Sequence, residues 1–391
     1  MTPRQRALVQ DTIPLLETSG EALTRHFYAM MLEEYPQVRP LFNQAHQASG
    51  EQQRALAYGI LMYARHLDNL DDIGPLVGRI VNKHVALQIL PEHYPIVGAC
   101  LLRAIAEVLG DAATDELIEA WAVAYGRLSE ALIGAEERLY AANEQAPGGW
   151  RGARRFRVAA KVIESEEITS FHFVPEDGGA VLRHRPGQYT CILLELDGVP
   201  LRRNYSLSAP SDGTGYRISV KREPGGRVSN HLHDQVQVGG PVDLFAPAGE
   251  FVLRDSDKPV VLITAGVGIT PSLPMLEAAR GQGREIHFIH CARHGGVHAF
   301  REWVERMAAE YPRLRHHFCY SEPRAEDRYH AAGLLGRHHL EEWLPVDRDL
   351  DAYFLGPRPF MAQVRKYLGQ LGVPAAQCHF EFFGPSSELE A

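Results

Sequence analysis

The sequence predicts a multidomain fold that combines an all-α part, an antiparallel β part and an α/β part. Three patterns along the 391 residues support this prediction. Residues 1–142 repeat apolar side chains at three- and four-residue spacing, which is typical of helices. Residues 156–223 alternate apolar and polar side chains, and from residue 258 buried strands alternate with helical segments.

The helical part is expected to end shortly before a Pro-Gly-Gly segment at residues 147–149. Beyond it, the four segments 156–165, 168–176, 187–198 and 216–223 read as antiparallel strands of a barrel or sandwich. The apolar runs after residue 258 predict a parallel sheet with crossover helices. We therefore expect domains at residues 1–142, 150–257 and 258–391.

Composition and charge limit the possible functions. The 40 Lys and Arg residues against 49 Asp and Glu residues give a net charge of −9, which argues against nucleic acid as a partner. The N-terminus has no apolar signal region, and no apolar run reaches the ~20 residues of a membrane span. Five cysteines without a CxxC pair favour a reducing compartment. We expect a cytoplasmic monomer with no membrane insertion.

Two motifs in the β part point to a phosphate-containing ligand. In the segment 202–208, Arg203, Asn204, Tyr205 and Ser206 combine an aromatic ring with a cation and a hydroxyl group, although a strand with a polar edge would look similar. The Gly-Gly turn at 225–226 precedes a helix that we expect to begin at Ser229. Such a turn could aim backbone N–H groups at an anion, or it could be a simple hairpin.

Two further motifs lie in the α/β part. The strand at 260–264 leads into Gly266-Val267-Gly268-Ile269-Thr270-Pro271, in which the glycines would let the backbone approach a pyrophosphate. This turn departs from GxGxxG, because a proline stands where the third glycine would be. A second turn contains Gly356 and Pro357.

The order of these four motifs resembles that of the ferredoxin-NADP reductase family from about residue 156 to the C-terminus. The resemblance implies a six-stranded antiparallel FAD-binding barrel followed by a nicotinamide-binding α/β domain. It also implies that the 266–271 turn and Gly356-Pro357 seat NADH or NADPH, although Leu355 stands where the family usually has cysteine. The residues implied for FAD binding are Tyr189, Arg203, Asn204, Tyr205, Ser206, Val228, Ser229, Phe382, Phe383, Gly384 and Pro385. Phe383 would lie against the isoalloxazine ring and Phe382 would tune its redox properties.

The residues after the second strand of the α/β part bear on the choice between NADH and NADPH. No carboxylate follows the strand at 286–289, where an NAD-specific site often binds the ribose hydroxyls. Arg293 is there instead, and an arginine suits a 2′-phosphate. We therefore expect NADPH to be used at least as well as NADH.

Four residues of the helical part are candidates for a haem site. His84 shares an apolar stripe with Val77 and Ile80, where a histidine is more often a core residue than a ligand. Tyr28 and Gln52 place polar side chains on otherwise apolar faces of two other helices, and Phe42 lies in a connecting turn. This set, with the segment 83–98, resembles the globin part of flavohaemoglobins. A globin followed by a reductase is the architecture of that family, so the resemblance covers nearly the whole chain.

The flavohaemoglobin resemblance implies haem b held by His84 as the proximal iron ligand. Tyr94 and Glu136 would polarise this histidine, with Glu137 as the adjacent alternative, while Phe42 and Leu56 would shape the haem pocket. On the other face Tyr28 would donate a hydrogen bond to bound O₂ and tune the site, and Gln52 would add a second donor. Lys83 either tunes electron transfer or simply lies on a solvated helix face.

The activity implied by the resemblance is that of a nitric oxide dioxygenase, which converts NO and O₂ to nitrate with electrons from NAD(P)H through FAD. Two alternatives remain open from the sequence. One is a flavin, ferric or peroxide reductase in which the globin is auxiliary, and the other is a sensor of O₂ or NO. A sensor would not need the complete reductase motifs.

Overall fold

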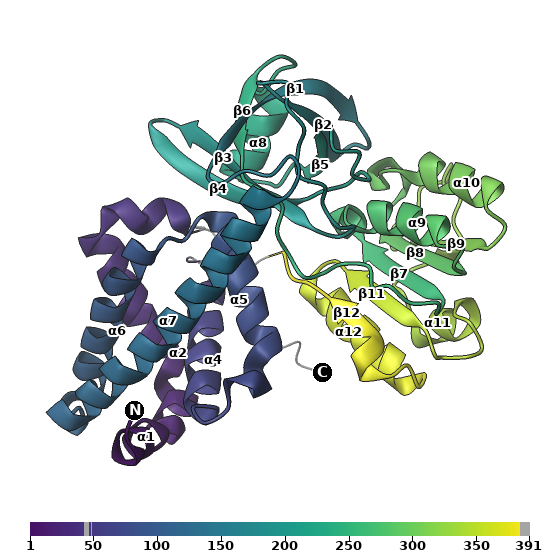
Figure 1. The fold of residues 1–391 in the computed structure, drawn as a ribbon. Helices are drawn as coiled ribbons and strands as arrows, with labels where there is room; N and C mark the ends of the chain where they lie inside the picture. The colour runs from purple at the N-terminus through teal and green to yellow at the C-terminus, as the bar shows by residue number, and fades with distance from the viewer. Residues whose placement is uncertain (43–46, 48, 384–391) are drawn as a thin grey trace. The chain divides into compact units, whose positions relative to one another are not determined.

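The computed structural model describes residues 1–42, 47 and 49–383 (Figure 1). Contacts divide these residues into two compact units. The first contains Met1–Gln145 together with Glu195–Arg202, and the second contains Ala146–Leu194 and Arg203–Phe383. Within the described residues, no helix has both the length and the apolar character needed to cross a membrane.

The first unit is helical, as its apolar periodicity predicts. Its α-helices are α1 (Pro3–Gln10), α2 (Ile13–Glu34), α4 (Glu51–Arg65), α5 (Gly74–Leu87), α6 (Tyr94–Leu109) and α7 (Asp115–Gln145). Short 3₁₀ turns connect them: η1 (Pro36–Leu41), η2 (Leu70–Ile73), η3 (Pro91–His93) and η4 (Gly110–Ala112).

Helices α2, α6 and α7 pack their apolar faces into the main core of this unit, with Phe27, Ile105 and Trp121 among the buried side chains. Gly98 makes the approach of α6 to α7 possible, because a Cβ atom there would lie 2.5 Å from the Tyr125 ring. This contact holds the beginning of α6, and therefore Tyr94, close to α7.

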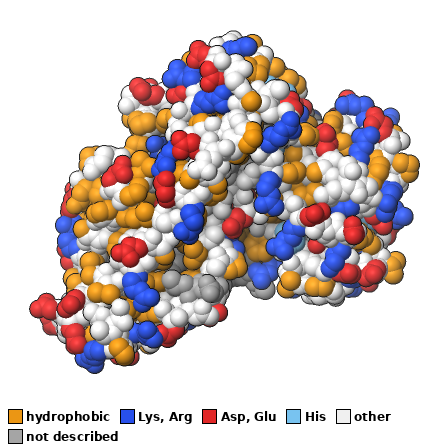
Figure 2. Space-filling view, viewed as in Figure 1, with side chains coloured by type: hydrophobic (Ala, Val, Ile, Leu, Met, Phe, Trp, Pro, Cys, Tyr) orange, Lys and Arg blue, Asp and Glu red, His pale blue; other side chains and the backbone are white. Residues whose placement is uncertain are grey.

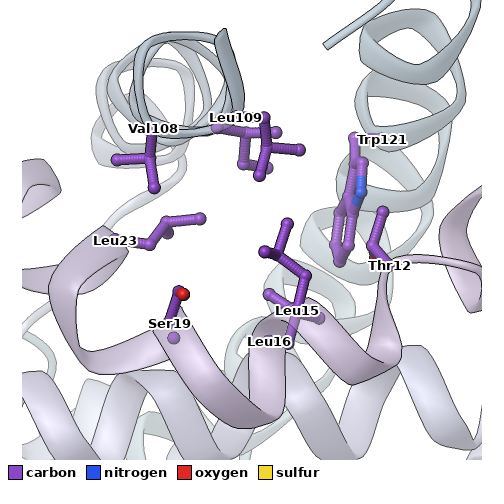
Figure 3. Close-up of a pocket in the computed structure, with 10 residues that line it drawn as sticks. Thr12, Leu15, Leu16, Ser19, Leu23, Val108, Leu109 and Trp121 are labelled. Carbon is purple, nitrogen blue, oxygen red and sulfur yellow. The ribbon is translucent and has the colours of Figure 1, made fainter. Parts of the chain in front are cut away.

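A small apolar hollow lies beside this core (Figure 3). The side chains around it come from α2, α6 and α7 and include Leu16, Leu23, Val108 and Trp121. Its lining contains no acid, base or metal ligand. The polar side chains of Tyr28 on α2 and His84 on α5 do not line this hollow.

Residues 146–257 contain a six-stranded sheet whose strand order is β4-β3-β6-β1-β2-β5, and all of it belongs to the second unit except the part of β3 and β4 within Glu195–Arg202. The pairs β1–β2, β1–β6, β2–β5 and β3–β6 are antiparallel. Leu207, which directly follows β4, forms a bridge with Ile218 of β5, so the two outer strands of this order are brought together as in a barrel. The elements are β1 (Arg154–Ile163), β2 (Ile168–Pro175), β3 (Tyr189–Leu196), β4 (Val199–Ser206), β5 (Tyr216–Lys221), α8 (Arg227–Asp234) and β6 (Pro241–Leu244).

The rest of the second unit is a parallel sheet of order β10-β9-β8-β7-β11-β12. Its strands are β7 (Val260–Ala265), β8 (Ile286–Ala292), β9 (Leu314–Tyr320), β10 (Ala331–Ala332), β11 (Asp351–Leu355) and β12 (Cys378–Phe380). Its helical elements are η5 (Gly266–Ile269), α9 (Ser272–Gly281), η6 (Gly295–Val297), α10 (Arg301–Glu310), α11 (Arg337–Trp343), α12 (Arg358–Gln370) and η7 (Ala375–Gln377).

Helices cover both faces of this sheet (Figure 1). Side chains of α9 and α10 share one core with β7 and β8, while α11 and α12 share another with β7 and β11. The predicted multidomain architecture of helical, antiparallel and α/β parts is thus confirmed. Figure 2 shows acidic and basic side chains intermixed over the visible surface rather than separated by sign.

Candidate active site

His84, Tyr94 and Glu136 come together in the first unit from α5, α6 and α7. The Nδ1 atom of His84 lies 2.7 Å from Oε1 of Glu136 and 3.2 Å from the Tyr94 hydroxyl. The same carboxylate oxygen accepts a 2.5 Å hydrogen bond from the Tyr94 hydroxyl. One buried oxygen therefore serves two donors.

The structure distinguishes between the two candidate carboxylates. The Glu136 side chain is only 3% exposed, whereas Glu137 lies on the exposed face of α7. Neighbouring residues of a helix point about 100° apart, so only one of the two can face His84. Burial, followed by the hydrogen bond to Glu136, raises the pKa of Tyr94 far above its ordinary value, so the phenol remains a donor.

Two tyrosines that the sequence reasoning missed support this cluster. The Tyr125 hydroxyl donates to the Tyr94 carbonyl at 2.7 Å, which ties α7 to the beginning of α6. The Tyr140 hydroxyl donates to the Ile89 carbonyl at 2.9 Å, just beyond the end of α5. Their signal in the sequence was weak, because tyrosines on an apolar stripe look like ordinary core residues.

Tyr28 and Gln52 also meet, which the sequence reasoning did not address. Tyr28 is buried on α2 and its hydroxyl group hydrogen-bonds to the Gln52 side chain on α4. Burial raises the pKa of Tyr28 above its ordinary value, while the bond to Gln52 acts in the opposite direction. Gln47, another residue that was missed, donates to Oε1 of Gln52 at 3.0 Å and so orients its amide.

The apolar partners of this pair lie close to it. The ring of Phe42 meets that of Tyr28 edge to face, with 5.6 Å between the centroids. Leu56 is half-buried against the same core. Lys83 precedes His84 on α5 and is half-buried.

These residues fit a haem group. Because Glu136 and Tyr94 engage Nδ1 of His84, Nε2 is the nitrogen that can ligate iron, and a carboxylate on the opposite nitrogen is a common partner of metal-bound histidine. The imidazole is 31% exposed although its carboxylate partner is buried. Tyr28 and Gln52 supply hydroxyl and amide hydrogen-bonding groups within the same unit.

The beginning of α8 fits a pyrophosphate. The helix starts at Arg227, two residues earlier than expected, because Gly226 is extended and serves as its N-cap. Among the described residues, no side chain caps this end, so first-turn N–H groups, including those of Val228 and Ser229, can bind an anion. The Ser229 hydroxyl accepts the Glu223 N–H at 3.2 Å and thereby shapes the preceding turn.

The other predicted flavin residues line β3 and β4. Arg203 and Tyr205 lie two residues apart on β4, and each influences the charge state of the other. Burial lowers the pKa of the Arg203 guanidinium and raises that of the Tyr205 hydroxyl. Tyr189 and Ser206 are buried, and Asn204 is exposed.

The two nicotinamide turns meet at the carboxyl ends of β7 and β11. A Cβ atom at Gly268 would lie 2.3 Å from the Leu355 carbonyl oxygen, and one at Gly356 would lie 2.9 Å from the Ala265 Cβ. Gly266 adopts a φ of +54°. Glycine is therefore required where the turns approach each other, which leaves their backbone open to a ligand at this edge.

The aromatic residues after β12 are close to the second of these turns. The Arg358 guanidinium lies 4.8 Å from the centroid of the Phe382 ring. Phe383 is 50% exposed, as a ring that covers a ligand would be before the ligand binds. Gly384 and Pro385 lie outside the described residues.

Arg293 directly follows β8, as predicted, but its guanidinium has a partner that the sequence did not suggest. It forms an ion pair with Glu167, which lies in the connection between β1 and β2. The two residues are 126 positions apart, so no local pattern could have linked them.

The fold and these sites define a class of oxidoreductase in which a haem-binding helical domain is joined to a flavin- and nicotinamide-binding reductase. The globin family matches residues 25–132. The oxidoreductase FAD-binding domain family matches residues 155–253, and the oxidoreductase NAD-binding domain family matches residues 262–366.

Full-length relatives place the chain within this class. It is 67% identical over 388 residues to the flavohemoprotein of Pseudomonas aeruginosa, and the alignment covers 99% of this chain and 99% of that protein. It is 47% identical to the flavohemoprotein of Deinococcus radiodurans, with 100% of this chain and 98% of that protein covered. The chain therefore belongs to the flavohaemoprotein family, and its cofactors are haem, FAD and a nicotinamide dinucleotide.

Solved structures agree with this assignment. Flavohemoglobin from Malassezia yamatoensis, determined with bound FAD and heme, matches with a TM-score of 0.87 at 28% identity, covering 98% of this chain and 99% of the other. The FAD/NAD-binding domain of nitric oxide dioxygenase from Vibrio cholerae matches with a TM-score of 0.56 at 40% identity. It covers 60% of this chain and 100% of the other.

Proposed function

We propose that the protein is a nitric oxide dioxygenase. In the balanced reaction, two NO, two O₂ and one NAD(P)H give two nitrate ions, NAD(P)⁺ and one proton. The observation that carries the proposal is the His84–Tyr94–Glu136 cluster, in a helical unit that also contains the buried Tyr28–Gln52 pair. The reductase motifs of the same chain, and their likeness to a nitric oxide dioxygenase domain, support it.

His84 would hold the haem through Nε2. When bound, haem would supply a one-electron centre for a diatomic ligand, FAD would supply the conversion between hydride and single-electron transfer, and the nicotinamide would supply the hydride. Glu136 accepts a hydrogen bond from Nδ1 of His84, so the imidazole gains anionic character and becomes a stronger donor, while the hydrogen bond from Tyr94 orients the carboxylate.

Tyr28, in the same helical unit, would act as a hydrogen-bond donor. Its raised pKa keeps the hydroxyl protonated throughout the physiological pH range. A buried donor interacts strongly with negative charge that develops on a bound diatomic molecule, because little water competes. Gln52 orients that hydroxyl and adds amide N–H groups.

In the second unit, the N-terminus of α8 would bind the flavin pyrophosphate, and the 266–268 turn would bind that of the nicotinamide cofactor. Arg203, Tyr205 and Phe383 would orient the flavin ring. We propose that the substrates are the free gases and that the enzyme acts as a monomer in the cytoplasm.

The decisive experiment follows NO consumption in the haem- and FAD-loaded full chain with an NO electrode. We expect rapid consumption that requires both NAD(P)H and O₂, with nitrate formed in a 1:1 ratio to NO. His84→Ala should lose both the Soret band and this activity but still reduce ferricyanide. NO consumption that proceeds without NAD(P)H, or that is unchanged in His84→Ala, would refute the proposal.

A further inference from the structure

An ion-paired carboxylate lies beside the arginine expected to choose between the two nicotinamide cofactors. Arg293 is the first residue after β8, and its carbonyl accepts the Glu322 N–H at 2.8 Å, which fixes the backbone there. Its guanidinium is paired with Glu167. An arginine engaged in this way is not equivalent to a free cation that awaits a 2′-phosphate.

The carboxylate of Glu167 also faces a second cation. One of its oxygens pairs with Arg293, and the other lies 4.0 Å from Nζ of Lys221 at the end of β5. Two cations that converge on one anion would equally suit a phosphate monoester, which has the same charge sign and similar oxygen acceptors. Glu167 therefore competes for cations that could bind such a phosphate, and Lys221 is shared with Glu223 at 3.6 Å.

The backbone holds Glu167 in this position. Its carbonyl accepts the Arg222 N–H at 2.7 Å, and its own N–H donates to the Ser165 hydroxyl at 3.3 Å. The preceding residue, Glu166, donates its N–H to the Gly296 carbonyl at 2.9 Å, and its carboxylate pairs with Arg324 at 2.6 and 3.0 Å. The β1–β2 connection is therefore attached to the loop that follows β8.

We propose that Glu167 is a specificity-determining residue that disfavours the 2′-phosphorylated nicotinamide cofactor. This proposal replaces the sequence expectation that NADPH serves at least as well as NADH. A 2′-phosphate bound to Arg293 would compete with Glu167 for the guanidinium and would lie close to its carboxylate. NADH, with a neutral ribose hydroxyl, meets no such repulsion.

The pair is open enough for the competition to be measurable. The Arg293 side chain is 53% exposed and that of Glu167 is 28% exposed, so breaking the ion pair itself costs little. The main penalty is the repulsion between carboxylate and phosphate in a solvent-screened setting. This repulsion corresponds to roughly a tenfold lower kcat/KM for NADPH relative to NADH.

The test compares kcat/KM for NADPH and NADH in the full-length holoenzyme with ferricyanide as electron acceptor. This assay rests on the hydride-transfer half of the proposed function and needs neither haem nor NO, so its failure is distinct from failure of the dioxygenase proposal. We expect the wild-type enzyme to favour NADH. Glu167→Gln should raise the NADPH/NADH ratio about tenfold, and 2′,5′-ADP should inhibit it more strongly while inhibition by 5′-AMP is unchanged.

Two further variants make the result specific. Glu166→Gln removes an equal charge from the same turn but from a carboxylate paired with Arg324, and it should change the ratio less than about twofold. Adding Arg293→Gln to Glu167→Gln should abolish the gain. The proposal is overturned if the wild-type enzyme prefers NADPH, if folded, FAD-loaded Glu167→Gln keeps the wild-type ratio, or if Glu166→Gln has the same effect.

Discussion

Replacing Glu136 with glutamine removes one negative charge from the buried cluster behind His84 and leaves its shape nearly unchanged. The Oε1 atom of Glu136 lies 2.5 Å from the Tyr94 hydroxyl and 2.7 Å from Nδ1 of His84. A glutamine oxygen can accept the same two hydrogen bonds, but without the charge. The variant therefore isolates the electrostatic contribution of this position.

The two hydrogen bonds set the size of the expected change in the midpoint potential of the haem. A hydrogen bond to a charged acceptor contributes about 1 kcal/mol more than its neutral equivalent, so the variant loses roughly 2 kcal/mol over the two bonds. The negative charge stabilises the oxidised, more positive iron more than the reduced one. If half of the loss falls on this difference, the midpoint potential rises by about 40 mV, since about 1.4 kcal/mol corresponds to 59 mV for one electron.

An anaerobic spectroelectrochemical titration of the haem-loaded full chain would measure this potential. Glu137→Gln is the matched control, because Glu137 is the next residue of α7 and lies on its exposed face. We expect a shift below about 10 mV for the control, together with slower NO turnover in Glu136→Gln alone. Equal potentials in the two variants, with histidine ligation intact, would show that the buried carboxylate does not tune the site.

Three other variants test separate parts of the molecule. Tyr28→Phe removes the buried hydroxyl that bonds to Gln52, so O₂ should dissociate about tenfold faster in flash photolysis; an unchanged rate would contradict the role of Tyr28 as a donor. Lys161→Met removes the ammonium group that donates to the carbonyls of Leu232, His233 and Val236 at the end of α8, so FAD should bind more weakly in a fluorescence titration; an unchanged FAD affinity would contradict this role of Lys161. Burial lowers the pKa of His290 from 6.5 to about 3, so the stability that neutral His290 provides is complete above pH 6.5 and is lost as pH falls toward 3. His290→Asn should therefore reduce the pH slope of the unfolding free energy between pH 6 and 4 by up to about 1.4 kcal/mol per unit, and an identical slope would exclude this contribution.

Much of the fold follows from local patterns in the sequence. The three- and four-residue spacing of apolar side chains reflects one buried face on each helix. The face of α7 that contains Trp121 is an example, because it is buried in the core of the first unit. The parallel sheet can also be predicted from the sequence, because β7 is an apolar strand that is buried along nearly its whole length and is followed directly by a glycine-rich turn. Helix ends were harder: α8 begins at Arg227 because Gly226, and not a hydroxyl side chain, forms its N-cap.

The site was predictable only where the residues belong to recognisable motifs. His84 and Tyr28 could be proposed because their positions resemble those of a family, whereas the choice of Glu136 over Glu137 required the actual rotation of α7. Glu167 could not be predicted, because its proposed role rests on a contact with Arg293 that forms only when the two parts of the second unit pack together. Tertiary electrostatics of this kind have no periodic signal in a sequence.

The electrostatics of the first unit favour catalysis over simple gas carriage. Reversible binding of O₂ needs a ligating imidazole and a pocket, and neither requires a carboxylate buried at a cost behind the imidazole. Glu136 is nevertheless almost fully buried, and its 2.7 Å hydrogen bond to Nδ1 places negative charge directly beside His84. The buried hydroxyl of Tyr28 can donate a hydrogen bond to a bound ligand that carries negative charge. Glu136 increases the electron density on His84, and Tyr28 can stabilise negative charge on a ligand. The two effects together favour reduction of a ligand, and the reductase part of the same chain supplies the electrons.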